Sequence, residues 1–115
     1  MSGDCIFCKI IRGDIPARIE FQDDAVIVFQ DINPAAPRHL LGAPCEHIET
    51  SWEFTGERGA LLGRLFEAMN SAAKKSGLAE NGYRIVLNCG PDGQQEVPHV
   101  HFHLLAGRPT TWPPG

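Results

Sequence analysis

The chain has 115 residues, a size typical of one domain, and 43% of them are hydrophobic, enough for a buried core. Ten Lys and Arg against fourteen Asp and Glu, with no basic run, make a poor match for a nucleic-acid backbone. No apolar stretch approaches the roughly 20 residues that span a bilayer, and the N-terminus lacks the features of an export signal. We therefore expect one domain over residues 1–115, located in the cytoplasm, that binds neither nucleic acid nor membrane.

The pattern of apolar residues predicts two helices and five strands. In chain order they are a helix over residues 5–12, strands over 18–22, 25–30 and 39–43, a helix over 57–76, and strands over 83–87 and 97–105. The long helix is the clearest element, because its apolar residues recur every three or four positions: Leu61, Leu62, Leu65, Phe66, Met69, Ala72 and Ala73. We interpret this stripe as core packing. Strands grouped around one long helix indicate an α+β domain with an antiparallel sheet.

Three of the five histidines, His99, His101 and His103, occupy alternate positions of the last predicted strand. Alternate side chains of a strand share a face, so the three imidazoles should lie together, roughly 6–7 Å apart. The apolar residues between them would then pack on the long helix. Two other interpretations stay open: a polar strand face without function, and a catalytic metal site, which would lack an Asp or Glu within this run.

A row of imidazoles can act on a phosphorus centre without a metal. A neutral imidazole can attack through Nε2, while a neighbouring imidazole donates a hydrogen bond to a phosphate oxygen. Phosphoryl transfer depends mainly on such positioning and charge stabilisation. The Gly-rich turn that precedes the strand, from Asn88 to Gly93, can supply further amide donors.

At this point the sequence resembles a known family. The run His99-Val100-His101-Phe102-His103-Leu104-Leu105 matches the histidine-triad (HIT) motif, in which histidines alternate with apolar residues. The resemblance extends from Cys5-Ile6-Phe7-Cys8-Lys9-Ile10-Ile11 through Phe29-Gln30-Asp31-Ile32-Asn33-Pro34 to the C-terminal Trp112-Pro113-Pro114-Gly115. This ending is similar to the branch of histidine-triad nucleotide-binding (HINT) proteins.

The resemblance implies a HIT-like fold with a five-stranded antiparallel sheet, one long helix and a short N-terminal helix. It also implies a homodimer with a continuous ten-stranded sheet. The implied activity is that of a purine nucleoside phosphoramidase, in which His101 attacks the α-phosphorus and forms a nucleotidyl-histidine intermediate. In this scheme His103 contacts a phosphate oxygen, and His39 and His99 support the pair through hydrogen bonds.

The same resemblance implies a nucleotide site for an AMP- or GMP-type purine nucleotide with an amine or acyl group on its phosphate. Its matched positions are Phe29 and Ile32 around the base, Asp31 at the ribose, Asn88 on the phosphate side and Trp112 near the partner's site. The other nucleotide-binding positions are Gln95, Glu96, Val97, His101 and His103. Glu96 stands where some HINT proteins have a serine that assists the leaving group, which leaves the leaving-group preference open.

Two other functions remain alternatives. A dinucleoside polyphosphate hydrolase would use the same triad, although the Trp-Pro-Pro-Gly ending disfavours it. A nucleotide-binding regulatory protein with vestigial hydrolysis would be marked by loss of the middle histidine, and His101 is present.

Cys5 and Cys8 form a Cys-x-x-Cys pair, which fits a metal site, free thiols, or a redox or disulfide pair. The resemblance suggests His47 and His99 as the other ligands of a tetrahedral, structural zinc site, with Cys45 as a substitute ligand. His99 would then be a positioning residue rather than a proton relay. No catalytic metal would be required.

Overall fold

The computed structural model describes residues 5–115 of the chain. Its elements are α1 (Ile6–Arg12), β1 (Ile19–Gln22), β2 (Val26–Gln30), β3 (Arg38–Pro44), two 3-10 turns (Ser51–Glu53 and Gly56–Arg58), α2 (Gly59–Lys75), β4 (Arg84–Leu87) and β5 (Phe102–Ala106). Every predicted helix and strand is present. Most boundaries differ from the prediction by one or two residues, and the long helix starts two residues late because a 3-10 turn precedes it.

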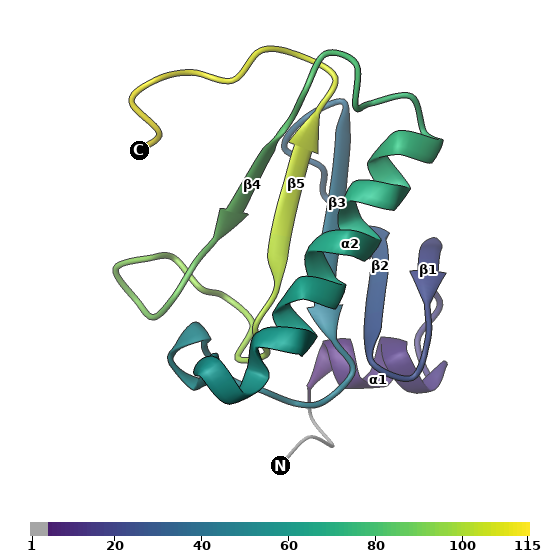
Figure 1. Ribbon diagram of the computed structural model, residues 1–115, viewed down its shortest axis with the longest axis vertical. Coiled ribbons are helices and arrows are strands. Elements are labelled where there is room, and N and C mark those ends of the chain that lie inside the picture. Colours follow the sequence, from purple (N-terminus) through teal and green to yellow (C-terminus); the bar gives the residue numbers. More distant parts are fainter. Residues whose placement is uncertain (1–4) are drawn as a thin grey trace.

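The five strands form one antiparallel sheet in the order β1-β2-β3-β5-β4 (Figure 1). Helix α2 runs across one face of this sheet (Figure 1). The α+β class and the five-stranded antiparallel sheet are therefore confirmed. The edge strands are β1 and β4, while β3 and β5 pair in the interior, with Leu41 opposite His103.

The two faces of the sheet bury different sets of side chains. On β2, Val26 and Val28 pack with α2, whereas Ile27 and Phe29 pack with α1 on the opposite face. This separation follows from the two-residue repeat of a strand. The apolar residues of β5 obey it too, because Phe102 and Leu104 belong to the core on the α2 side. The face on the α1 side is left for His39 and the histidines near β5.

Helix α2 approaches the sheet closely at Gly42 of β3. A Cβ atom at this position would lie 2.6 Å from Sδ of Met69, which is fully buried. Since real Cβ atoms do not come so close to a neighbour, glycine allows the helix to settle on β3. The helix ends at Lys75 and is capped by Ser76, and the following Gly77 has a φ of +74°, the left-handed conformation that glycine adopts without strain.

Helix α1 begins and ends at residues suited to these positions. At its start, the Sγ atom of Cys5 accepts a hydrogen bond from the amide of Cys8 at 3.4 Å. At its end, Gly13 has a φ of +86° and its amide donates to the carbonyl of Ile10. The first turn of the helix therefore places the two cysteines close together, with both buried against the sheet.

The prediction of one strand over residues 97–105 is wrong in its first half, because β5 begins only at Phe102. Pro98 has no amide hydrogen for a strand ladder and restricts the residue before it. The chain turns there, and the amide of His99 bonds to the carbonyl of Val97 at 2.8 Å. The amide of Val100 then donates to the carbonyl of Ile48, at 2.6 Å. His99 consequently lies outside the strand, although its ring contacts Phe7 as the ring of His101 does.

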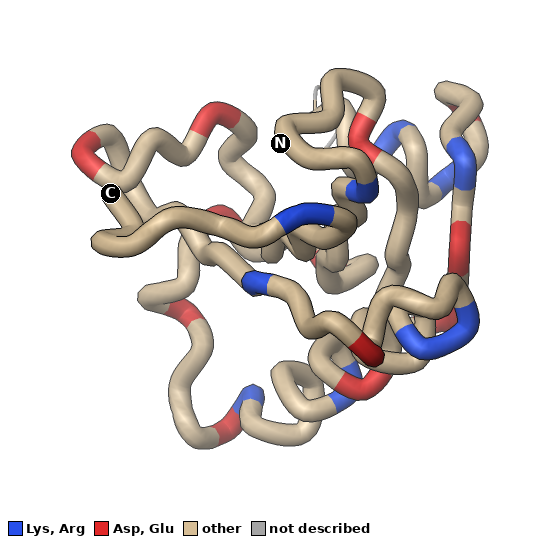
Figure 2. Tube along the Cα trace, turned by 90° about the horizontal axis from the view of Figure 1, so that it is seen from above, with Lys and Arg blue, Asp and Glu red and all other residues tan. Residues whose placement is uncertain are grey.

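Among residues 5–115, no helix has the length and apolar character needed to cross a bilayer. Lys and Arg are interspersed with Asp and Glu over the described part of the chain (Figure 2). The charges therefore do not form one continuous basic face.

Candidate functional site

His101 lies immediately before β5, with its imidazole buried and oriented by the backbone. Its Nδ1 atom is 2.7 Å from the carbonyl oxygen of His99. A carbonyl only accepts, so Nδ1 carries the proton and Nε2 carries the lone pair. The edge of the ring packs against Phe7 of α1, with centroids 4.8 Å apart. Burial lowers the pKa of His101, which favours the neutral form that a nucleophile or base requires.

His103 is on β5 and completes a chain of hydrogen bonds that starts at the backbone of Ala35. The amide of Ala35 donates to Nδ1 of His39 at 3.0 Å, so the proton of this imidazole is on Nε2. That Nε2 lies 2.8 Å from Nδ1 of His103 and donates to it. The proton of His103 is therefore on its own Nε2, which is left as a donor for another acceptor.

The three imidazoles of this site are held neutral by their surroundings. Burial and the nearby rings of His101 and His39 lower the pKa of His103 to about 4. Burial also lowers the pKa of His39, against the opposing effect of the Asp31 carboxylate. The rings of His101 and His103 lie 5.0 Å apart, closer than ideal strand geometry predicts. The pair thus presents a lone pair on one ring and a donor on the next.

Asp31 and its neighbours lie where β2 ends beside this pair. One oxygen of Asp31 accepts from the amide of Asn33 at 2.8 Å, and the other is 3.4 Å from Nε2 of His39. Ile32 is 91% exposed, whereas Phe29 is buried with its ring against Phe7. The structure therefore brings Asp31 to His39 and His103, and these three residues also offer a possible set of metal ligands. The resemblance placed all three residues in one site, but the sequence did not predict the contact of Asp31 with His39, because Asp31 is remote from the histidine run.

The turn between β4 and β5 is compact and is held by Gln95. Its Oε1 accepts from the amide of Gly90 at 3.1 Å, and its Nε2 donates to the carbonyls of Glu49 and Val97, at 2.7 and 3.0 Å. A Cβ atom at Gly93 would lie 2.5 Å from the carbonyl oxygen of Cys89, so the turn requires glycine. Gln95 therefore braces the backbone of the predicted phosphate side.

The other predicted residues on this side differ in exposure. Asn88 is half-buried directly after β4, and Glu96 is exposed. The charge of the Glu96 carboxylate opposes the lowering of the pKa of His101. Trp112 is exposed, and the Arg84 guanidinium lies 5.9 Å from the centroid of its ring. Each remains a predicted nucleotide contact.

Cys5, Cys8, His47 and His99 come together as the resemblance implied, with one donor atom from each within 4.8 Å of the others. Nδ1 of His99 is 3.3 Å from Sγ of Cys5, and Nδ1 of His47 is 3.3 Å from Sγ of Cys8. The Nε2 of His99 donates to the carbonyl of Pro44 at 2.8 Å, so its Nδ1 has a free lone pair. Two sulfurs and two nitrogens are the donor set of structural zinc sites, and the residues fit this ion.

Phe7 and the carbonyl of Pro44 are functional contacts that sequence reasoning did not find. Phe7 packs edge-on against both His99 and His101. Its place between the two cysteines of the Cys-x-x-Cys pair was the available signal. No signal marks Pro44, since a backbone carbonyl contributes regardless of side chain. Cys45, named as a substitute ligand, instead points its Sγ to the carbonyl of Asp23, 3.5 Å away.

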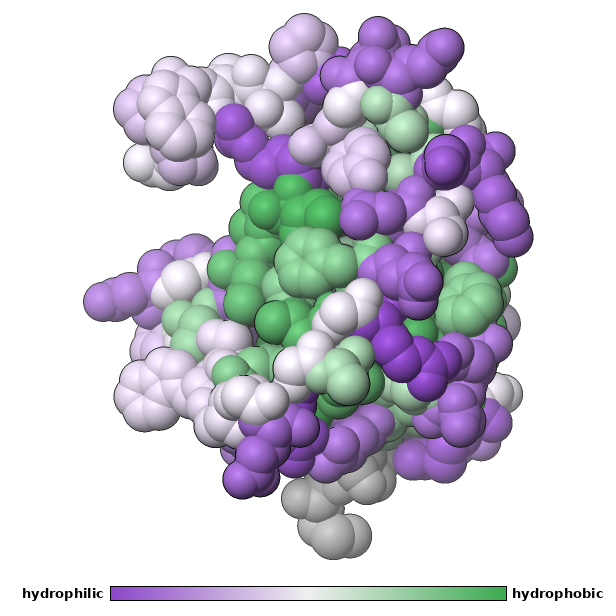
Figure 3. Space-filling view, viewed as in Figure 1, coloured by the Kyte–Doolittle hydropathy of each residue, from purple (hydrophilic) through white to green (hydrophobic). Residues whose placement is uncertain are grey.

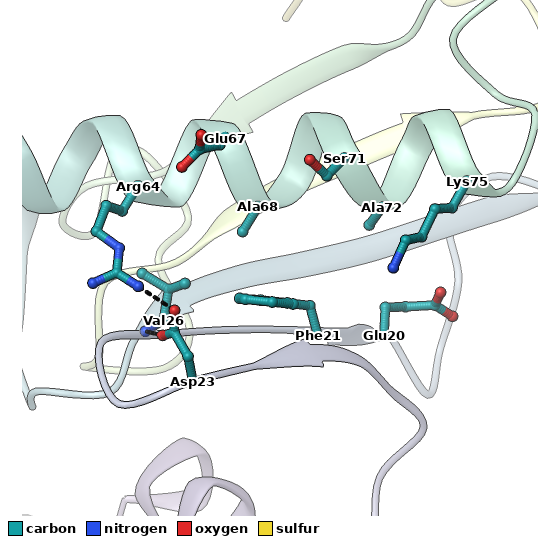
Figure 4. A pocket seen from close by; sticks show the side chains of 10 residues that line it. All are labelled: Glu20, Phe21, Asp23, Val26, Arg64, Glu67, Ala68, Ser71, Ala72 and Lys75. Carbon is teal, nitrogen blue, oxygen red and sulfur yellow. Dashed lines mark hydrogen bonds and ion pairs between the residues drawn. The ribbon is translucent and has the colours of Figure 1, made fainter.

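A separate cavity of about 240 Å³ lies between β1 and α2, on the other side of the sheet from the histidines. Arg64 of α2 donates to the carboxylate of Asp23 at one end, and Phe21 points into the cavity (Figure 4). Its lining residues include no histidine or cysteine. The cavity thus lacks the residue types that carry the chemistry on the opposite face.

Comparison with known proteins agrees with this geometry. Residues 4–111 match the family model described as scavenger mRNA decapping enzyme, C-terminal binding. The chain is 50% identical to an uncharacterized HIT-like protein of Synechococcus elongatus over 115 residues, 100% of both chains. It is 45% identical to the purine nucleoside phosphoramidase of Escherichia coli over 109 residues, 95% of this chain and 92% of the relative.

A solved structure shows the same fold. The crystal structure of a HIT family hydrolase from Legionella pneumophila superposes with a TM-score of 0.94 at 46% identity, covering 97% of this chain and all of that one. This likeness, the family model and the curated relatives extend over nearly the whole chain. The chain belongs to the histidine-triad (HIT) family of hydrolases.

Proposed function

We propose that this protein is a purine nucleoside phosphoramidase that works through a covalent nucleotidyl intermediate on His101. The observation that carries the proposal is the complementary protonation of two adjacent rings. Nδ1 of His101 donates its proton to the carbonyl of His99, and Nδ1 of His103 accepts a hydrogen bond from His39. One ring therefore offers a nucleophilic Nε2, and the other offers an N–H donor for a phosphate oxygen.

In the proposed reaction, the Nε2 lone pair of His101 attacks the α-phosphorus of the nucleotide. A P–N bond to His101 forms as the bond from phosphorus to the leaving amine breaks, and the amine departs with a proton taken from solvent. Water then attacks the same phosphorus, the P–N bond to His101 breaks, and the nucleoside monophosphate and neutral His101 are released as one proton returns to solvent. The N–H of His103 offsets the negative charge that develops on the phosphate oxygens in both steps.

We place the rest of the nucleotide at the C-terminal end of β2 and the turn before β5. Asp31 is half-buried next to His39 and has an oxygen available for ribose hydroxyls, beside the exposed apolar side chain of Ile32 for the base. Phe29 supports this region by packing its ring against that of Phe7. On the phosphate side we place Asn88, Gln95, Glu96 and Val97, and near the partner's site Trp112.

We also propose that Cys5, Cys8, His47 and His99 hold a structural zinc ion. The ion would join the start of α1 to the segment that leads into His101. Both thiols and His99 are buried, and the carbonyl of His99 is the acceptor that orients His101. When bound, the ion supplies four bonds across a small domain whose apolar core is limited.

A homodimer through β4 is the proposed assembly. The outer edge of β4 has no partner strand among residues 5–115, and unpaired edges favour association. Figure 3 shows an apolar surface over this strand, hollowed between the C-terminal segment above it and a loop below it. Leu87 is exposed there, and Ile85 and Phe66 are only partly buried. Pairing of two copies would extend the sheet and cover this surface.

His101→Ala should lower kcat for adenosine 5′-phosphoramidate by at least about a thousandfold, because the nucleophile is removed. Nucleotide binding should persist, since His103 and the ribose and base contacts remain. Mass spectrometry of the quenched wild-type protein should show a nucleotidyl adduct on His101. Glu67→Gln, on the exposed side of α2, is the control. Turnover retained by His101→Ala would exclude the proposed intermediate.

Burial lowers the pKa of His101 from the ordinary histidine value of about 6.5. The acid limb of the kcat/KM profile should therefore lie below pH 6.5. Activity is present above the lowered pKa and is lost as His101 gains a proton below it. Glu96→Gln should move the limb to still lower pH, because the carboxylate that opposes the shift is removed. A pH–rate profile of both proteins tests this, and a limb moved upward in Glu96→Gln would contradict it.

Protein purified without chelator should contain one zinc ion per chain, as measured by mass spectrometry of the metal. Cys8→Ser should lose the ion and lower the Tm by at least about 5 °C, since four bonds across the domain are lost. Cys45→Ser should keep the ion, because Cys45 lies outside the cluster. Zinc content well below one per chain in the wild type would rule out the structural site.

Leu87→Lys should convert the dimer to a monomer, because it places a charge on the surface that the partner covers. Sedimentation equilibrium measures the mass, which should be twice that of one chain for the wild type. Ile19→Lys introduces the same charge on the opposite edge strand, β1, where Ile19 is also exposed, and should leave the dimer intact. Dissociation by Ile19→Lys alone would place the interface on the other edge.

A further inference from the structure

One side of the Cys5–Cys8–His47–His99 cluster opens onto a surface cavity of about 300 Å³. The cavity is lined by Cys5 and His47 of the cluster, and by Ile6, Glu49, Glu96, Val97 and Pro98. It therefore combines two of the four candidate metal ligands with two carboxylates that have no part in the cluster. The proposed hydrolysis leaves Glu49 without a role.

The other sides of the cluster are closed by protein. His99 is fully buried, and its Nε2 is occupied by the carbonyl of Pro44. The ring of Phe7 covers His99 from the side of α1, at 5.8 Å between centroids. His47 is only half-buried, and it is the imidazole that reaches the cavity. The open path for an ion from solvent to the buried sulfurs therefore passes His47.

The charge of this cavity is negative. Its described lining residues include Glu49 and Glu96 but no Lys or Arg. Both carboxylates are exposed and carry no side-chain hydrogen bond or ion pair among the described contacts of residues 5–115. The nearby Glu46 differs, because Arg58 binds both of its oxygens, at 2.8 and 3.0 Å. The negative field at the mouth therefore comes from Glu49 and Glu96.

Gln95 holds the two sides of the mouth together. Its Nε2 donates to the carbonyl of Glu49 at 2.7 Å and to the carbonyl of Val97, next to Glu96, at 3.0 Å. The backbone under each carboxylate is thus tied to the same amide group. This arrangement fixes the spacing of the two backbone segments that carry the carboxylates.

We propose that Glu49 and Glu96 form a capture site through which a divalent metal ion, zinc in particular, reaches the buried cluster. This inference rests on the proposed zinc site. Carboxylates attract a hydrated cation from solution and can replace some of its water, because zinc accepts oxygen ligands. The ion then passes to His47, the half-buried ligand at the base of the cavity, and from there to the thiolates and His99. The capture site governs the rate of loading more than the final affinity.

The test measures zinc uptake and not hydrolysis. Metal-free wild type and the double variant Glu49→Gln/Glu96→Gln are mixed with zinc chloride in a stopped-flow instrument, and uptake is followed by the sulfur–zinc charge-transfer absorbance. We expect the association rate of the double variant to fall about tenfold at low ionic strength, the lower end of electrostatic steering effects. The difference should nearly vanish at about 1 M salt, where the Debye length is about 3 Å.

Glu67→Gln/Glu80→Gln is the matched control, since it removes the same charge from exposed positions outside this cavity and should load at the wild-type rate. Equal loading rates for wild type and Glu49→Gln/Glu96→Gln would overturn the capture site and leave the zinc site standing. A double variant that changes only the KM for the nucleotide would likewise overturn the capture site and leave the zinc site standing. That result would assign the cavity to the leaving group. A wild type that binds no zinc would overturn both proposals.

Discussion

His99 is fully buried, and each of its polar groups has a partner. Its Nδ1 faces the two thiols, its Nε2 donates to Pro44 on β3, and its amide bonds to Val97. Its carbonyl accepts the Nδ1 proton of His101. Burial of a histidine without these partners would lower the stability of the fold, because its unpaired polar groups lose their hydrogen bonds to water. One residue therefore connects the Cys5–Cys8–His47–His99 cluster, the sheet and His101.

This connection links the Cys-x-x-Cys pair to the orientation of His101. Helix α1 brings Cys5, Phe7 and Cys8 to the face of the sheet where the histidines lie. Phe7 packs on both His99 and His101, so it contributes to the burial that lowers the pKa of His101. The short N-terminal helix thus shapes the dielectric environment of the site as well as the proposed metal centre.

Separation of the two sheet faces makes the arrangement stable. The long helix covers the face formed by Val26, Leu40 and Leu104, which is apolar and needs no polar partners. Polar groups are gathered on the other face, where the chain from Ala35 through His39 to His103 satisfies every ring nitrogen except the one left for a ligand. Packing therefore supplies stability on one face, and hydrogen bonds supply orientation on the other.

The sequence by itself determined the elements, the α+β class and the histidine motif, because period-two and period-3.6 patterns depend on local geometry. It also pointed to Cys5, Cys8, His47 and His99 through resemblance. The late start of β5 follows from Pro98, which is a local signal in the sequence. Only the tertiary structure decided that Asp31 meets His39 and His103, and that Gln95 joins the turn before β5 to the carbonyl of Glu49. Those features depend on contacts between residues far apart in the chain, and several involve backbone carbonyls and amides. Since every residue type carries these groups, no sequence pattern reveals which of them will become the partner of a buried imidazole.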